Sequence, residues 1–479
     1  MPNPDGPEVR RLEAFVDQVR RDGFVSAALL GMGGSSLCPE MLQRIFGSAG
    51  GIELRVLDST DPAHVRAFES TLDIDRTLFI VSSKSGTTLE TSLFHAHFFE
   101  RVKERSGRDA AGARFVAVPD PGPALDRLAT GGGFRAVFHG EVSIGGRYSA
   151  LSYFGLVPAA LVGLDVRMLL VRARAMADVC GPESPASENP GVQLGLVLGL
   201  AARDGRDKAT LVTSPGLDGF GAWIEQLLAE STGKNGHGII PVDGERLDDP
   251  AVYGDDRVFV ATTLNGEPDE RREESLDALV RVGHPVVRIR IRDKYDVAAE
   301  CFRWELATAV AGSVLGVHPF DQPDVEASKV ATRAVTSQGT ASGRAAAAGR
   351  VAELAYDAGV ISAYVARPYS SALRRSVGAE APVQHWVTAH IRRLRPRGYF
   401  AVLAYLEMCD PYRRILGELR HQVRAATRVA TTVGFGPRFL HSTGQAHKGG
   451  PANGLFLVLT CAHVADVPVP RQELTFGAV

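Results

Sequence analysis

The chain has 479 residues, of which 45% are hydrophobic and 23% charged, and its formal net charge of −2 with scattered basic residues argues against a nucleic-acid partner. Five cysteines without a C-x-x-C pair argue for a reducing compartment and against a disulfide framework or a zinc site: Cys38, Cys180, Cys301, Cys409 and Cys461. Because the N-terminus lacks a signal peptide and the apolar run at 151–164 is too short to span a bilayer, we expect a cytoplasmic protein without a membrane partner.

The first third of the chain alternates strand-like and helix-like segments. Apolar, β-prone runs predict strands at Phe24–Leu30, Ile52–Leu57, Leu78–Val81, Arg114–Val118 and Phe134–Phe138. The segments between them predict helices at Pro39–Phe46, Pro62–Ser70, Leu89–Arg105 and Ala124–Ala129. This alternation predicts a doubly wound parallel α/β sheet, in which ligands bind beyond the C-terminal ends of the strands.

A second alternating series follows a mostly helical stretch over residues 155–200. It predicts strands at Thr210–Thr213, Gly238–Val242, Val258–Thr262 and Val286–Ile291, and helices at Phe220–Ala229, Glu273–Val282 and Asp296–Val314. Strand-like runs return at Tyr399–Leu406, Ala430–Phe435 and Gly454–Thr460. We expect a first lobe over 1–165, a second lobe with connecting helices over 166–337, an insert of uncertain role over 338–425, and a return to the second lobe over 426–479.

A hydroxyl-rich turn follows the predicted strand at 78–81. Between Ser82 and Thr88 the chain carries five hydroxyl side chains, one lysine and one glycine, and a helix begins immediately afterwards. Free backbone N–H groups and the helix dipole favour an anion at this place, which suits a phosphate monoester. The turn has neither the Walker A nor the Rossmann spacing, so it favours a small phosphorylated metabolite over a nucleotide. The alternative is an ordinary Ser/Thr helix cap.

Four further stretches carry candidate chemistry. In Gly145-Gly146-Arg147, the arginine can hold a phosphate or an oxyanion bidentately, unless it is a solvated residue beside a cap. Glu230 opens a Glu-Ser-Thr-Gly-Lys stretch near the C-terminal end of a helix, where a carboxylate is a better base, unless it is a surface residue. The third stretch is residues 315–329, and the fourth is the Gly-rich loop at 439–451, which holds two histidines. The alternative interpretation of each is a solvated polar segment without a role in the chemistry.

Together these stretches resemble the phosphoglucose isomerase family. The resemblance covers most of residues 29–329 and resumes at 441–460, and the Gly-Gly-Arg-Tyr-Ser and Glu-Ser-Thr-Gly-Lys stretches carry it in combination. The Leu-His-Ser-Thr-Gly-Gln stretch looks like the isomerase half of transaldolase–isomerase fusions, although no transaldolase segment is visible. The resemblance implies two sugar-isomerase (SIS-type) lobes, each with three αβα layers. It also implies additional helices and an insert in the C-terminal lobe.

The resemblance also implies a reaction and its residues. Glucose 6-phosphate and fructose 6-phosphate would interconvert through an enediolate, without a metal or a cofactor. Glu230 would move the proton, Arg147 would stabilise the enediolate, and Lys329 with a histidine would open the sugar ring. The implied substrate-binding residues are Gly34, Ser35, Ser83, Lys84, Ser85, Thr87, Thr88 and Gln322. A base and an oxyanion stabiliser are what removal of a proton next to a carbonyl requires.

The position of the histidine loop departs from the family. In the usual order this loop precedes the catalytic lysine, whereas here His441 follows Lys329. His441 fits the Leu-His-Ser-x-Gly-Gln pattern, while His447 is closer to the histidine that follows Gly-Gln in other members, so both are candidates for ring opening.

Two other functions compete: an isomerase that also accepts mannose 6-phosphate, and a non-catalytic SIS-type sugar-phosphate sensor. A homodimer and a transaldolase domain or partner are also expected from the resemblance.

Overall fold

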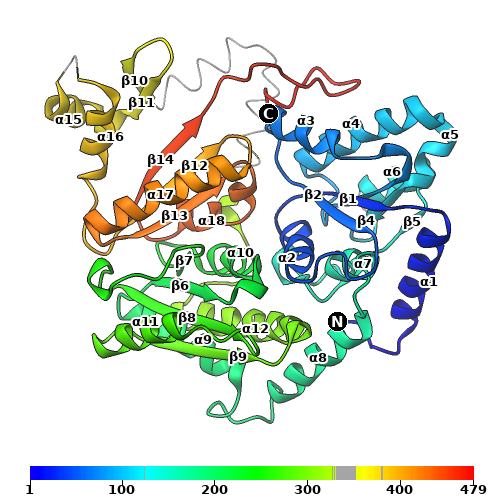
Figure 1. Ribbon diagram of the computed structural model, residues 1–479, viewed down its shortest axis with the longest axis horizontal. Coiled ribbons are helices and arrows are strands. Elements are labelled where there is room, and N and C mark those ends of the chain that lie inside the picture. Colours follow the sequence, from blue (N-terminus) through cyan, green and yellow to red (C-terminus); the bar gives the residue numbers. More distant parts are fainter. Residues whose placement is uncertain (123, 326, 328–329, 331–351, 379–380) are drawn as a thin grey trace.

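Three parallel sheets organise the protein in the computed structural model, which describes residues 1–122, 124–325, 327, 330, 352–378 and 381–479 (Figure 1). The strand orders are β2-β1-β3-β4-β5, β7-β6-β8-β9 and β13-β12-β14, and a hairpin, β10-β11, stands apart from them. The predicted α/β class with doubly wound parallel lobes is confirmed.

The first sheet is buried on both faces. Its strands are β1 (Ser26–Gly31), β2 (Glu53–Leu57), β3 (Thr77–Ser82), β4 (Phe115–Val118) and β5 (Ala136–Val137). Its helices are α1 (Pro7–Arg21), α2 (Leu37–Phe46), α3 (Pro62–Ser70), α4 (Leu89–Ser106), α5 (Arg108–Ala111), α6 (Ala124–Gly131) and α7 (Tyr153–Leu161). Side chains alternate along β1: Leu29 joins the core under α1, α2 and α7, whereas Ala28 and Leu30 join the core under α3, α4 and α6.

The second sheet shares its main core with the first. Its strands are β6 (Lys208–Thr213), β7 (Ile240–Val242), β8 (Arg257–Leu264) and β9 (Val286–Ile291). Its helices are α8 (Val166–Val179), α9 (Pro190–Arg203), α10 (Phe220–Thr232), α11 (Glu270–Arg281) and α12 (Val297–Leu315). Leu211 of β6 and Trp304 of α12 belong to the same apolar cluster as Leu29, so the two lobes are joined by continuous packing.

The third sheet contains β12 (Tyr399–Tyr405), β13 (Ala430–Phe435) and β14 (Gly454–Thr460), with α17 (Asp410–Thr427) and α18 (Gly444–Gly449). Ile240 and Val242 of β7 share a small core with Tyr399 and Ala430, which places this sheet against the second lobe. The hairpin β10 (Ala352–Asp357) and β11 (Ser362–Ala366) and helices α15 (Arg367–Val377) and α16 (Val383–Ile391) project from it (Figure 1).

The four-part division of the chain stays a proposal, and the third sheet refines it. Strand β12 lies within the expected insert and β13 and β14 within the expected return, yet they form one sheet. We therefore propose that residues 399–460 form one unit. Residues 338–343, at the start of the expected insert, lie outside the described residues. Within the described part of the chain, no helix is both long and apolar enough to cross a membrane.

Close packing between α9 and α12 depends on small residues. Three glycines lie four residues apart on α9, on the side that meets α12: Gly191, Gly195 and Gly199. At Gly195 an added Cβ would lie 2.5 Å from the carbonyl oxygen of Ala307 and 2.6 Å from Cβ of Val310. Both distances are shorter than van der Waals contact, so one helix would have to move away from the other.

Replacing Gly195 with alanine should therefore destabilise the protein by about 1–3 kcal/mol, although alanine favours a helix more than glycine does. The measurement is the free energy of unfolding in urea. Gly417→Ala is the matched control, because Gly417 also lies within a helix but has no atom within 4 Å of an added Cβ. The control should stabilise the protein by about 0.5–1 kcal/mol, and equal effects at both positions would contradict the packing argument.

Candidate active site

Two groups of the predicted site residues lie directly after the C-terminal ends of parallel strands. The turn at 83–88 joins β3 to α4, and a short 3-10 turn, η1 (Gly33–Ser35), follows β1. A Cβ on Gly34 would lie 2.2 Å from the carbonyl oxygen of Gly146, so only glycine allows η1 to meet the Arg147 segment this closely. Ser35 is buried in the same turn.

The hydroxyl-rich turn is tight and exposes several of its side chains. Gly86 has φ of +65°, a left-handed conformation that suits glycine, and its N–H donates to the carbonyl of Ser83. Thr88 is the N-cap of α4, but its side chain makes no capping hydrogen bond; instead it accepts one from Ser83 Oγ at 3.3 Å. Ser85 and Thr87 are exposed and hydrogen-bonded to each other at 3.1 Å. The hydroxyl groups are therefore not used to cap the helix, which favours the anion-binding interpretation.

Lys84 points away from these hydroxyl groups. Its ammonium group forms an ion pair with Asp120 and lies 3.3 Å from the carbonyl oxygen of Val142. Asp120 follows β4, so the pair ties two neighbouring strand ends together. In this arrangement Lys84 stabilises the turn, and its predicted place beside a phosphate stays a prediction.

Arg147 and Glu230 meet in the interior. Arg147 is only 3% exposed, and its Nη1 lies 3.1 Å from Oε1 of Glu230. The other acceptors around the guanidinium are Ser231 Oγ at 2.7 Å, Gln322 Oε1 at 3.0 Å, and the carbonyl oxygens of Pro319 at 2.6 Å and Asp321 at 3.0 Å. The guanidinium thus donates four hydrogen bonds and forms an ion pair with Glu230. Three predicted site residues, Arg147, Glu230 and Gln322, are brought into direct contact.

Gln226 joins the carboxylate to the histidine loop. It lies one helical turn before Glu230 on α10, and its Nε2 donates to Oε2 of Glu230 at 3.1 Å and to the backbone carbonyl of His441 at 2.8 Å. Sequence reasoning missed this residue, although the four-residue spacing on a helix that carries a candidate base was a usable signal.

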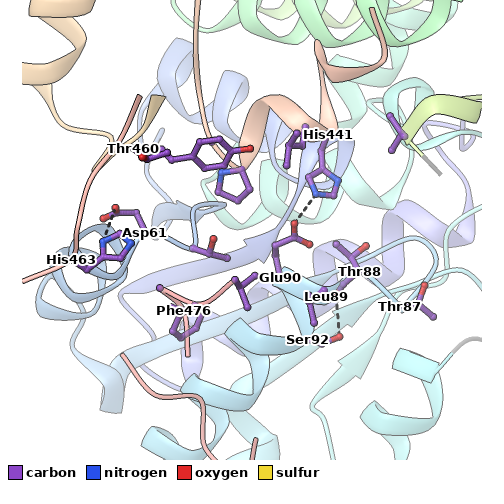
Figure 2. Close-up of a pocket in the computed structure, with 18 of the residues that line it drawn as sticks. Asp61, Thr87, Thr88, Leu89, Glu90, Ser92, His441, Thr460, His463 and Phe476 are labelled. Carbon is purple, nitrogen blue, oxygen red and sulfur yellow. Dashed lines mark hydrogen bonds and ion pairs between the residues drawn. The ribbon is translucent and has the colours of Figure 1, made fainter. Parts of the chain in front are cut away.

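The two candidate histidines have different surroundings. Nε2 of His441 lies 2.9 Å from Oε1 of Glu90, in the first turn of α4, and this contact orients the imidazole (Figure 2). His447 lies on α18, bonds to the hydroxyl of Tyr399 at 3.1 Å and packs against Phe456. Burial lowers the pKa of His447 to about 4, so this imidazole is neutral at pH 7. His441 is the one that faces the cavity described next.

A cavity of about 750 Å³ opens between the first lobe and the third sheet. Its wall includes Ser85, Thr87 and Thr88 of the hydroxyl-rich turn, together with Glu90 and His441 (Figure 2). Arg147 and Glu230 do not line it; they lie behind His441 and are reached through Gln226. The cavity and the buried carboxylate are therefore adjacent parts of one region.

The segment after α12 is fixed by two buried side chains. Lys234, from the Glu-Ser-Thr-Gly-Lys stretch, donates to the carbonyl of His318 and to Oδ1 of Asp321 at 2.7 Å. Burial lowers the pKa of Lys234, while the hydrogen bond to Asp321 opposes that shift. Oε1 of the buried Gln445 accepts from the backbone N–H of Asp324 at 3.0 Å. Lys329, the predicted ring-opening lysine, lies outside the described residues.

The comparisons with known proteins now add to the geometry. The phosphoglucose isomerase family model matches residues 23–250. Glucose-6-phosphate isomerases from Rubrobacter xylanophilus and Bacillus cereus are each 29% identical, over 66% and 68% of this chain and 84% and 82% of their own lengths. The chain is therefore similar to phosphoglucose isomerases over about two thirds of its length.

Solved structures share the fold of this chain. A hypothetical protein from Thermus thermophilus superposes with a TM-score of 0.62 and 25% identity, covering 68% of this chain and 87% of that one. A glucose-6-phosphate isomerase from Chlamydia trachomatis superposes with a TM-score of 0.59 and 21% identity, covering 71% and 75%, and at that identity it supports the fold.

A buried ion network anchors the histidine loop. Arg438, three residues before His441, donates to Oδ1 of Asp58 at 2.9 Å and lies 2.6 Å from Oε2 of Glu40. Ser36 donates to Asp58 at 3.0 Å. Asp58 follows β2 and Glu40 lies on α2, so the network ties the loop to the first lobe. No sequence motif pointed to it, because Arg438 and Asp58 lie 380 positions apart in the chain.

Glu40 makes the stability of the protein depend on pH. Burial by itself would raise the pKa of Glu40, but Arg438 and Arg44 hold it at about 2, against an ordinary value of 4.5. A carboxyl group with a lowered pKa in the folded state stabilises the fold above 4.5, and that stabilisation is lost as the pH falls from 4.5 towards 2.

Glu40→Gln should therefore be less stable than the wild type at pH 7, by on the order of 3 kcal/mol, and the difference should shrink below pH 4.5. Urea unfolding at pH 7 and at pH 3.5–4.5 (about the window set by these pKa values) measures both effects. Glu53→Gln, which removes an exposed partner of Arg55, is the control and should change little. A pH-independent difference between Glu40→Gln and the wild type would be evidence against the ion network.

Proposed function

We propose that this chain interconverts D-glucose 6-phosphate and D-fructose 6-phosphate with Glu230 as the proton-transferring base. The contact between Glu230 and Arg147, next to a cavity lined by hydroxyl groups, is the observation that supports this assignment. The phosphate would bind at Ser83, Ser85, Thr87 and Thr88, where backbone N–H groups and hydroxyls provide donors. Binding of the phosphate positions carbon atoms some distance away from it.

The proton transfer follows from the neighbours of Glu230. The carboxylate takes the proton from C2 of the open-chain aldose, the electron pair forms a C1=C2 double bond, and negative charge develops on O1. Glu230 then returns the proton to C1, while a proton passes from O2 to O1, which completes the ketose. As Glu230 becomes neutral, Arg147 loses the partner of its charge and can stabilise the enediolate instead.

Ring opening precedes this step, because the hexose phosphates are mostly closed rings. We assign it to His441, since its imidazole lies in the cavity wall and is oriented by Glu90. Lys329 would assist. Gly34 and Ser35 would line the sugar site, and Gln322 would bind the sugar after exchanging its contact with Arg147 for one with the substrate.

The assembly and location of the enzyme are also proposals. We infer a homodimer from the resemblance to the phosphoglucose isomerase family, and a transaldolase partner or domain from the resemblance of the histidine stretch to the fusion enzymes. A cytoplasmic location fits the five cysteines, none of which forms a disulfide.

Glu230→Gln should lower kcat for glucose 6-phosphate by about 10²–10⁴-fold and leave KM close to the wild-type value, because the amide keeps the shape of the side chain but cannot accept the proton. The assay contains a chelator, and calorimetric binding of fructose 6-phosphate is measured in parallel. Glu274→Gln, an exposed position on α11, is the control. Wild-type protein that binds the sugar phosphate without turnover would instead indicate a sensor, and a fully active Glu230→Gln protein would exclude Glu230 as the base.

The two histidines should respond differently to substitution. His441→Gln should slow turnover of ring-closed substrate by about 10²-fold or more, because it removes a proton donor and acceptor from the cavity. His447→Gln should leave kcat nearly unchanged and lower the melting temperature, because it removes buried packing around Tyr399. Steady-state kinetics and thermal unfolding of both variants separate these results. The reverse pattern would assign ring opening to His447.

A further inference from the structure

Three potential metal ligands meet in the wall of the cavity, away from Glu230 and Arg147. A carboxylate oxygen of Asp61, Sγ of Cys461 and a ring nitrogen of His463 all lie within 4.8 Å of one another. All three residues line the 750 Å³ cavity. Figure 2 shows the side chains of Asp61 and His463 pointing toward each other, on the opposite side of the cavity from His441.

The spacing of these atoms is close to that of a metal tripod. With the usual zinc–ligand bond lengths, neighbouring ligand atoms in a tetrahedral site lie about 3.3–3.6 Å apart. Nδ1 of His463 lies 3.7 Å from Oδ2 of Asp61. A contraction of at most about 1.5 Å would bring all three atoms into range of one ion. Carboxylate, thiolate and imidazole are each common ligands of zinc, and the mixed set favours a borderline metal over Mg²⁺ or Ca²⁺.

The backbone holds these ligands near their present places. Asp61 is the N-cap of α3 and accepts from the backbone N–H of His64 through Oδ1, which leaves Oδ2 for a second partner. Cys461 and His463 follow β14 directly, so the end of this edge strand, which pairs with the buried β12, positions them. Arg66 of α3 donates to the carbonyl of Ala465 at 2.6 Å, which ties this segment to the first lobe. Such support reduces the cost of assembling a site.

We propose that Asp61, Cys461 and His463 form a binding site for a divalent cation of the zinc type, with the fourth coordination position open to the cavity. Isomerisation as proposed above involves no metal, so the site does not depend on that function. A bound ion would join the end of β14 to the start of α3 and so fix one wall of the cavity. In the sequence alone, the scattered cysteines argued against a zinc site. Ligands drawn from both ends of the chain leave no short cysteine spacing by which such a site could be recognised.

Cobalt binding tests the site without relying on activity. Protein treated with a chelator and a reductant is titrated with Co²⁺, whose bond to a thiolate gives a charge-transfer absorption band in the near ultraviolet. We expect one Co²⁺ per chain, this band, and its loss when Zn²⁺ is added. Cys461→Ser should abolish the band, and His463→Ala should weaken Co²⁺ binding by about 100-fold or more.

Two controls keep the result interpretable. Cys409→Ser removes another incompletely buried thiol, outside the cavity, and should retain the band and the stoichiometry. Zn²⁺ should raise the melting temperature of the wild type and of Cys409→Ser but not of Cys461→Ser, since only an ion bound to the folded state stabilises it. Absence of the band in the wild type, or a band that survives in Cys461→Ser, would overturn the proposal and leave an Asp61–His463 ion pair as the role of these residues.

Discussion

The buried guanidinium of Arg147 is the interaction on which the rest of the site depends. The guanidinium holds the end of α10, through Glu230 and Ser231, and the segment that follows α12, through three acceptors. A buried cation is stable only when its charge is matched and its donors are satisfied. The same contacts that satisfy Arg147 therefore fix the position of Glu230, so stability and chemistry impose one geometry.

The site is assembled from all three sheets. The hydroxyl-rich turn belongs to the first, the Glu230 helix to the second, and His441 to the loop after β13 in the third. Single contacts join them: Glu90 to His441, Gln226 to Glu230, and Arg438 to Asp58. A small shift of one sheet would separate the proposed ring-opening histidine from the proposed base, and reactions of this kind lose rate steeply with misplacement. The continuous core beneath the first two sheets limits such shifts.

Much of the fold followed from the sequence, because local pattern and tertiary structure agree. Ile52–Leu57 was predicted and β2 is Glu53–Leu57, and the strand at Val286–Ile291 was predicted to the residue. Buried parallel strands are short runs of apolar, β-branched residues, which makes them easy to locate. Helix α17 was not predicted, although Leu416, Leu419 and Val423 have helical spacing, because the Arg-rich composition of the surrounding segment suggested an insert.

The site was predictable where the family resemblance names the residues and not where long-range packing decides. The resemblance implied that Arg147, Glu230 and Gln322 act together, and the three are in contact. Neither the turning of Lys84 toward Asp120 nor the burial of His447 leaves a trace in the local sequence. Both depend on which strand ends become neighbours in three dimensions. The contrast between His441 and His447 is therefore a consequence of the third sheet: one loop places its first histidine at the cavity beside Glu90 and its second among the aromatic rings of Tyr399 and Phe456.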